Sequence, residues 1–222
     1  MIDCCIFDLD GVIVDTAKYH YLAWKRLAGE LGFDFTEADN EALKGVSRMA
    51  SLDILLDAGG MKDRFTPAEK EAMAARKNGW YVEYISAMLP DEILPGVVPF
   101  LEELRARRVK IALGSASKNA PTILERVGIA GLFDAVVDGS MVSEAKPDPQ
   151  VFVLGAELTG CVPAECVVFE DAEAGIEAAT RAGMRSVGVG GSPLLAQATI
   201  QIDTFEGLTL DGLQTALAEA AH

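Results

Sequence analysis

Short apolar runs that end in polar residues recur along the chain, and this pattern restricts the fold more than any other feature. The runs cover residues 4–7, 109–113, 135–137, 167–169 and 186–189. Each is followed by a turn and then, in most cases, by a helical pattern, which is typical of parallel strands joined by covering helices. We therefore predict an α/β fold with a parallel sheet, and we expect ligands at the carboxyl ends of its strands.

Residues 16–88 follow a different pattern, because strand-like runs vanish and helical periodicity takes over. Within this segment a helix is predicted to begin after Thr66, where Glu69 completes a capping box. We therefore predict a helical module of residues 16–88 that is inserted into a core formed by residues 1–15 and 89–222.

The chain is strongly acidic, with 34 Asp and Glu against 19 Lys and Arg and a formal net charge of -15 at pH 7. Nucleic acids and anionic membranes both need a positive protein surface, so neither is an expected partner. No apolar stretch approaches the roughly 18 continuous residues of a membrane span, and Asp3 interrupts the position of a secretory leader. We therefore expect a soluble, cytoplasmic protein.

The four cysteines, Cys4, Cys5, Cys161 and Cys166, have adjacent and five-apart spacings. These spacings match neither a zinc ribbon nor a redox CxxC pair. Cysteine is among the residue types most often buried, so we expect buried strand residues and loop thiols.

The first polar cluster consists of Asp8 and Asp10, which follow the apolar run 4–7. Side chains two apart on an extended segment face the same way, so both carboxylates can address one pocket, and Gly11 then lets the chain turn. A carboxylate can attack phosphorus to form an acyl phosphate, while a second carboxyl group moves the proton of a sugar hydroxyl. The alternative is an ordinary aspartate turn at a solvated strand end.

The second cluster is the segment 115–119, Ser-Ala-Ser-Lys-Asn, which leads from an apolar run into a predicted helix. Small residues at a helix amino terminus suit an anion, although Ser117 or Asn119 could instead be an ordinary helix cap. Lys146 forms a third signal ahead of another predicted helix, and a surface lysine is the alternative there.

The fourth cluster is the pair Glu170 and Asp171, which follows the apolar run 167–169. Two acids beside two more at neighbouring strand ends repel each other unless a cation lies between them. Hard oxygen ligands with room for phosphate and water fit Mg²⁺. The sequence therefore predicts a magnesium site at this edge of the sheet.

Taken together and in this order, the four clusters resemble the haloacid dehalogenase-like phosphotransferase superfamily, over nearly the whole chain. The resemblance implies a doubly wound, Rossmann-like core with an inserted helical cap domain. It implies that Asp8 is the nucleophile, that Asp10 is the general acid and base, and that Ser115 and Lys146 hold the transferring phosphate. It also implies a magnesium site formed by Asp8, the backbone carbonyl of Asp10, Asp171 and, directly or through water, Glu170.

The helical module carries Thr16, His20 and Trp24 at four-residue spacing, the stretch Leu-Lys-Gly-Val-Ser-Arg at 43–48 and Arg-Lys-Asn at 76–78. Together with the segment 115–119, these stretches resemble those of superfamily members that move a phosphate between two hydroxyls of one sugar. The resemblance implies that Arg48, with residues 117–119, holds the phosphate that is not transferred, and that Lys77 reaches the sugar or the active-site carboxylates. It implies that Thr16 and His20, also expected to be catalytic, position Asp10. The expected substrate-binding residues are Trp24, Leu43, Lys44, Gly45, Val46, Ser47, Arg48, Ser51, Lys77, Ser115, Ala116, Ser117, Lys118, Asn119 and Lys146.

The implied reaction moves a phosphate between the 1- and 6-hydroxyls of glucose, with Mg²⁺ and the priming intermediate β-glucose 1,6-bisphosphate as cofactors. We expect small sugar phosphates as partners and a monomeric protein. The main alternative is a sugar-phosphate phosphatase of the same fold, in which water discharges Asp8 and a second phosphate site is not needed. A catalytically silent phosphate-binding protein is disfavoured, because both Asp8 and Asp10 are present.

Overall fold

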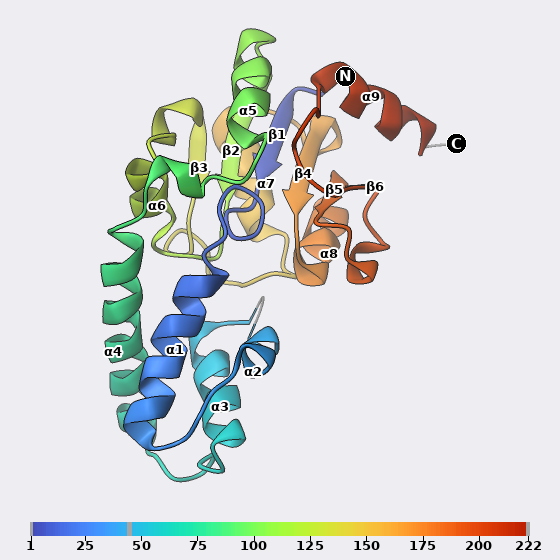
Figure 1. The fold of residues 1–222 in the computed structure, drawn as a ribbon. Helices are drawn as coiled ribbons and strands as arrows, with labels where there is room; N and C mark the ends of the chain where they lie inside the picture. Colours follow the sequence, from blue (N-terminus) through green and yellow to red (C-terminus); the bar gives the residue numbers. More distant parts are fainter. Residues whose placement is uncertain (1, 44–45, 221–222) are drawn as a thin grey trace. The chain divides into compact units, whose positions relative to one another are not determined.

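Six parallel strands form one sheet in the computed structural model, which describes residues 2–43 and 46–220 (Figure 1). The order across the sheet is β3-β2-β1-β4-β5-β6. Along the chain, β2 and β3 are added on one side of β1, and β4, β5 and β6 are then added on its other side. This order confirms the predicted doubly wound core. The strands are β1 (Cys4–Phe7), β2 (Lys110–Gly114), β3 (Ala135–Val137), β4 (Cys166–Glu170), β5 (Arg185–Val189) and β6 (Ile200–Ile202).

The predicted strands β1 to β5 are all present, with ends shifted by one residue at most, whereas β6 was not predicted. The chain forms two compact units, a sheet unit of Met1–Asp15 with Met88–His222 and a helical unit of Thr16–Ala87. The helices are α1 (Ala17–Leu31), α2 (Glu37–Glu41), α3 (Arg48–Ala58), α4 (Pro67–Ile85), α5 (Val97–Ala106), α6 (Ala120–Arg126), α7 (Gln150–Thr159), α8 (Glu173–Arg181) and α9 (Leu210–Glu219).

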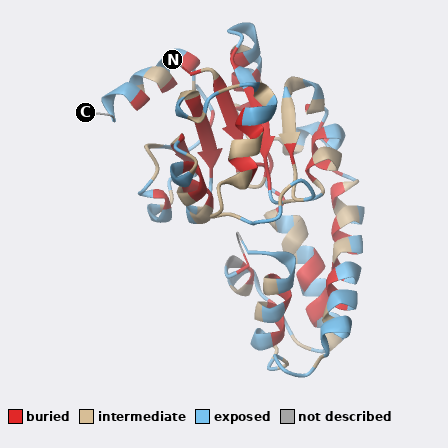
Figure 2. Cartoon of the chain, turned by 180° about the vertical axis from the view of Figure 1, so that it is seen from behind, coloured by how far each residue is buried: buried red, intermediate tan, exposed pale blue. Residues whose placement is uncertain are grey.

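The central strands β1 and β4 are buried on both faces, as expected for parallel strands that are covered by helices, whereas the edge strands β3 and β6 are partly exposed (Figure 2). Successive residues of β1 face opposite sides. Ile6 belongs to an apolar cluster that includes residues of α7 and α8. Phe7 faces the other side, where its ring stacks on Phe169 with centroids 4.6 Å apart and meets Phe100 of α5 and Phe205. Two apolar layers therefore hold β1 in place.

The helical unit contains α1 to α4, with α4 packed against α1 and α3. The predicted capping box at the start of α4 is present: the Thr66 side chain accepts from Glu69 N at 3.4 Å, and Glu69 Oε2 accepts from Thr66 N at 2.7 Å. On α1, Ala23, Trp24, Leu27 and Ala28 are buried and form its packed face. The capping signal therefore predicted the start of α4 correctly.

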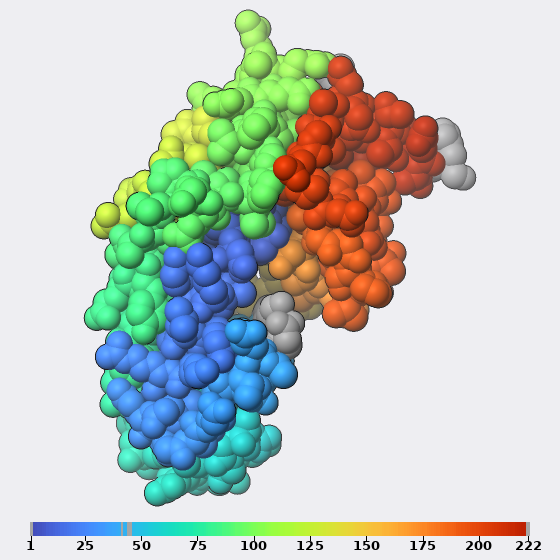
Figure 3. Space-filling view, in the orientation of Figure 1, coloured from blue at the N-terminus to red at the C-terminus, as the bar shows by residue number. Residues whose placement is uncertain are grey.

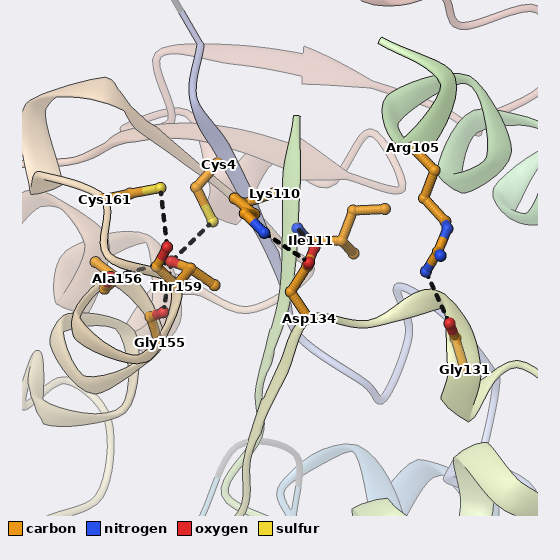
Figure 4. A network of polar contacts seen from close by, with 10 residues as sticks. All are labelled: Cys4, Arg105, Lys110, Ile111, Gly131, Asp134, Gly155, Ala156, Thr159 and Cys161. Atoms are coloured by element: carbon orange, nitrogen blue, oxygen red, sulfur yellow. Dashed lines mark hydrogen bonds and ion pairs between the residues drawn. The ribbon is translucent and has the colours of Figure 1, made fainter. Parts of the chain in front are cut away.

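Polar contacts tie the amino-terminal ends of several strands to neighbouring elements (Figure 4). Asp134 Oδ2 accepts a hydrogen bond from Ile111 N at 2.9 Å, which joins the segment before β3 to β2. Thr159 Oγ1 lies 3.6 Å from Cys4 Sγ, and Cys161 Sγ lies 3.8 Å from the Thr159 carbonyl oxygen. All four cysteines are free thiols, buried except for the partly exposed Cys161, which confirms the prediction made for them.

Within the sheet unit, the segment that leads toward the helical unit lies against the segment that returns from it. Val14 and Ile93 form an antiparallel bridge, and Leu94 N donates to Ile13 O at 2.9 Å. Backbone hydrogen bonds therefore join the outgoing segment to the returning segment within the sheet unit.

The last helix, α9, packs beside α5 on the surface of the sheet unit (Figure 3). The Arg107 guanidinium lies 2.9 Å from Asp211 Oδ1, and Leu210 N donates to Glu103 Oε1 at 3.1 Å.

Across the described part of the chain, none of the helices is long and apolar enough to cross a membrane.

Candidate active site

Two acidic residues lie at the carboxyl ends of β1 and β4, the neighbouring strands between which the strand order changes direction. Asp8 directly follows β1, and Glu170 is the last residue of β4, the strand that pairs with β1. Asp8 N donates to Phe169 O at 2.9 Å, and Asp8 Oδ2 accepts from Asp10 N at 3.0 Å. In doubly wound sheets this edge is the place where ligands bind.

Lys146 links the two acids through its ammonium group. Its Nζ lies 2.5 Å from Asp8 Oδ1 and 2.9 Å from Glu170 Oε2, and its side chain is only 10% exposed. Burial alone opposes the charged ammonium, but the carboxylates of Asp8 and Glu170 outweigh it and raise the pKa of Lys146. The alternative of a surface lysine is therefore wrong, and Lys146 is a charged group inside the site.

Three carboxylates of this site can hold a cation together. Asp8, Glu170 and Asp171 each offer an oxygen atom, and these atoms all lie within 4.8 Å of one another. Burial, with repulsion from Asp8 and Asp171, raises the pKa of Glu170 from 4.5 to about 8 against the opposing effect of Lys146. Desolvation, with repulsion from Asp8 and Asp10, raises the pKa of Asp171 from 3.8 to about 7.

The pKa values of Glu170 and Asp171 are raised chiefly by burial, with repulsion between the carboxylates in addition, and Lys146 does not offset the two effects together. A hard divalent cation relieves this repulsion, and an all-oxygen donor set is the one that Mg²⁺ prefers. The residues therefore fit the predicted magnesium site. The role of the Asp10 carbonyl as a ligand stays a prediction.

Two glycines leave space for the acidic side chains. Gly11 has φ of 76°, and a Cβ atom there would lie 2.0 Å from Asp171 Oδ2. At Gly175, in the first turns of α8, a Cβ would lie 2.0 Å from Glu170 Cδ. Gly175 was not predicted as a site residue, although a lone glycine inside a helical pattern costs stability and thus indicates close packing.

The segment after β2 forms a small hydrogen-bonded loop. Ser115 is buried; its N donates to Val137 O at 3.0 Å, and its Oγ accepts from Ser117 N at 3.1 Å. Ser117 Oγ accepts from Asn119 N at 3.3 Å in the turn before α6, and Asn119, at the N-cap position of that helix, makes no side-chain capping hydrogen bond. Ala116 and Lys118 are exposed on this loop.

In the helical unit, the structure brings four of the predicted residues close together. Lys77 Nζ lies 2.9 Å from His20 Nδ1 and 4.5 Å from the ring centroid of Trp24. Burial, followed by the charges of Lys77 and Arg48, lowers the pKa of His20 well below its ordinary value. These residues therefore form a cationic group around a neutral histidine.

The other predicted residues of the helical unit have varied positions. Thr16, Leu43 and Ser51 are buried, whereas Val46 is exposed. Ser47 is the N-cap of α3, where its side chain accepts from Ala50 N. Lys44 and Gly45 lie outside the described residues.

Residues 2–183 match the model of the haloacid dehalogenase-like hydrolase family. The chain belongs to this family. Among haloacid dehalogenase-like hydrolases it is 45% identical over 207 residues to the β-phosphoglucomutase of Bacillus subtilis, which covers 93% of this chain and 91% of that protein.

Two further proteins are similar to this chain over most of its length. A crystal structure of β-phosphoglucomutase from Clostridium difficile matches with a TM-score of 0.92 and 42% identity, covering 100% of this chain and 99% of that chain. A phosphorylated carbohydrates phosphatase of Thermotoga maritima is 33% identical over 187 residues, which cover 83% of each protein. The resemblance predicted from the sequence is confirmed, and the similarity favours a mutase over a phosphatase of the haloacid dehalogenase-like family.

Proposed function

We propose that this protein is a Mg²⁺-dependent β-phosphoglucomutase, which interconverts β-glucose 1-phosphate and glucose 6-phosphate through β-glucose 1,6-bisphosphate. The observation that supports this most is the contact of Asp8 with Lys146 at the end of β1, in a chain 45% identical to a β-phosphoglucomutase. A carboxylate at a ligand-binding strand end, held by a buried cation, is suited to attack a phosphate.

In the proposed reaction an oxygen atom of Asp8 attacks the phosphorus of the bisphosphate. The bond between this oxygen and phosphorus forms as the bond to the sugar oxygen breaks, and the carboxyl group of Asp10 gives its proton to that sugar oxygen. The reverse steps then transfer the phosphate from Asp8 to the 6-hydroxyl of a β-glucose 1-phosphate, whose hydroxyl proton passes to Asp10, and this regenerates the bisphosphate and the free Asp8 carboxylate. Two easier transfers thus replace one direct transfer.

Lys146 and Ser115 hold the oxygens of the transferring phosphate in this mechanism, and catalysis then depends mainly on position and charge. When bound to Asp8, Glu170, Asp171 and the Asp10 carbonyl, Mg²⁺ supplies positive charge that offsets the charge of the phosphate oxygens. Lys146 also keeps Glu170 in place through its 2.9 Å contact.

The helical unit acts as the cap in this proposal. Arg48 binds the phosphate that is not being transferred, together with Ser117, Lys118 and Asn119, because a guanidinium offers paired N–H donors to phosphate oxygens. Thr16 and His20 position Asp10. The other substrate-binding residues predicted above, a cytoplasmic location and a monomeric state remain predictions.

The decisive experiment distinguishes a mutase from a phosphatase. The protein is incubated with β-glucose 1-phosphate, a trace of β-glucose 1,6-bisphosphate and Mg²⁺, and glucose 6-phosphate and free phosphate are measured side by side. We expect glucose 6-phosphate as the main product. Free phosphate formed without glucose 6-phosphate would overturn the proposal in favour of the phosphatase.

A further inference from the structure

A buried lysine of the helical unit is surrounded by aromatic rings. Lys77 of α4 is only 2% exposed, and its Nζ lies 4.5 Å from the ring centroid of Trp24 and 4.9 Å from that of Tyr81. Ring faces attract cations, and the attraction is strongest where water is excluded. The two rings therefore hold the Lys77 ammonium in one place.

The position of this ammonium decides which nitrogen of His20 carries a proton. Lys77 Nζ lies 2.9 Å from His20 Nδ1. An ammonium group can donate hydrogen bonds but cannot accept them, so Nδ1 must be the acceptor and must be unprotonated. The hydrogen of the neutral ring is then on Nε2, which leaves His20 as a donor at that atom.

Tyr81 contacts both members of this pair. Its ring is 1% exposed and stacks on the imidazole of His20, with centroids 4.1 Å apart and planes inclined by 30°. The same ring lies beneath the Lys77 ammonium. Trp24 contacts Lys77 in a similar way, but the stacking contact with His20 comes from Tyr81.

We propose that Tyr81 is a positioning residue: its ring holds the Lys77 ammonium against His20 Nδ1 and so keeps the proton of His20 on Nε2. This inference rests on the proposed function for its effect on catalysis, since a His20 that only donates at Nε2 orients an acceptor and does not act as a base. The arrangement of the proton itself is independent of that function. Tyr81 was not among the residues predicted from the sequence.

Nitrogen NMR of histidine tests the proposal without substrate. The sequence has two histidines, of which one is the last residue, so ¹⁵N-histidine labelling in a His222→Gln background isolates the ring of His20. In the parent we expect Nδ1 to give the signal of an unprotonated, hydrogen-bonded nitrogen and Nε2 that of a protonated one. Tyr81→Leu should average the two signals, whereas Tyr81→Phe, which keeps the ring, should match the parent.

Tyr84→Leu is the matched control, because Tyr84 is a partly buried tyrosine of the same helix outside this group. It should leave the signals of His20 unchanged. Lys77→Met keeps an unbranched side chain but removes the donor, and it should produce the same averaging even if Tyr81→Leu fails to fold. Parent-like His20 signals in either Tyr81→Leu or Lys77→Met would overturn the proposal.

Activity gives the second measurement. Loss of the ring in Tyr81→Leu should lower kcat about tenfold, the scale of a desolvated cation–π contact, with KM little changed. Averaged His20 signals with parent kcat would leave the proton arrangement standing but remove its role in catalysis. Parent-like signals would refute the inference even in a fully active mutase, so the two failures are distinguishable.

Discussion

Lys146 Nζ lies 2.5 Å from Asp8 Oδ1, and the same ammonium lies 2.9 Å from Glu170 Oε2. One cation therefore holds the proposed nucleophile and a proposed metal ligand at the same time. Because removal of one partner leaves a buried charge uncompensated, substitutions that keep the shape and the hydrogen-bond acceptor are the most informative here.

The first prediction concerns Asp8. Asp8→Asn keeps one oxygen that can accept from Lys146 and gives up the second oxygen that accepts from Asp10 N, and its amide cannot form an acyl phosphate. Turnover should be abolished while the far-UV circular dichroism spectrum stays that of the parent. The checks are conversion of β-glucose 1-phosphate and labelling of the protein by acetyl phosphate. Parent-level activity in the variant would refute covalent catalysis by Asp8.

The second prediction concerns Gly175. In Gly175→Ala the new methyl group would lie 2.0 Å from Glu170 Cδ, so Glu170 must leave its place beside Lys146. Displacing a ligand in this way should weaken Mg²⁺ binding by about 10–100-fold, the range found for changes in groups that support metal ligands. Titration of activity with Mg²⁺, and calorimetry of Mg²⁺ binding, measure the effect.

Gly29→Ala is the control for this variant, because Gly29 is also inside a helix and a Cβ there has no atom within 4 Å. It should leave Mg²⁺ dependence unchanged and stabilise the protein by about 0.5–1 kcal/mol. An unchanged Mg²⁺ requirement in Gly175→Ala would contradict the assigned role of Glu170.

The third prediction concerns pH and the acidic cluster. The pKa of Glu170 is raised from 4.5 to about 8, so between these pH values the metal-free folded protein binds a proton that the unfolded chain releases. Stability should therefore be highest in the lower part of this range and fall as pH rises toward 8. Saturating Mg²⁺, which binds the ionised carboxylates, should oppose the fall.

Thermal unfolding across this pH range, with chelator or with Mg²⁺, measures that slope. Glu170→Gln is the control, since an amide does not titrate and the slope in chelator should become shallower. A parent whose melting temperature in chelator rises with pH throughout the range would contradict the burial of these carboxyl groups.

The fourth prediction separates the two proposed phosphate sites through Arg48. Arg48 is exposed in this structure, and the proposal pairs its guanidinium with the second phosphate once substrate is bound. Truncation of one partner of a charge pair that is buried in a complex typically removes about 2–5 kcal/mol, so Arg48→Ala should lower mutase efficiency by more than tenfold. Phosphorylation of Asp8 by acetyl phosphate needs no second site and should survive. Arg64→Ala, an exposed arginine of the same unit, is the control. Equal losses in both assays would mean that Arg48 supports the fold or the transfer site instead.

Much of the sheet could be predicted because its strands are apolar runs that end abruptly in polar residues. β6 escaped prediction because it is only Ile200–Ile202 and its middle residue, Gln201, is exposed at the edge of the sheet. The capping box at Thr66 was predictable because all its groups lie within one turn of helix.

The site was predictable only in part, since its contacts join residues far apart in the chain. The spacing of Asp8 and Asp10 indicated a shared pocket, but no spacing rule places Lys146 beside Asp8, 138 residues away. Only the family resemblance implied that meeting. Gly175 and Tyr81 were missed because their importance comes from side chains on other elements, namely Glu170 and His20.

The bridge between Val14 and Ile93 has a consequence for how this enzyme family can vary. This bridge joins the segment that leaves the sheet unit to the segment that returns to it. The helical unit between them is therefore equivalent to one closed loop in the folding of the sheet unit. The entropy of closing a loop grows only with the logarithm of its length, at about 0.6 kcal/mol for each doubling. Helical inserts of very different size are therefore nearly equivalent for the folding of the sheet, so the length of the insert can change at little cost to the sheet unit.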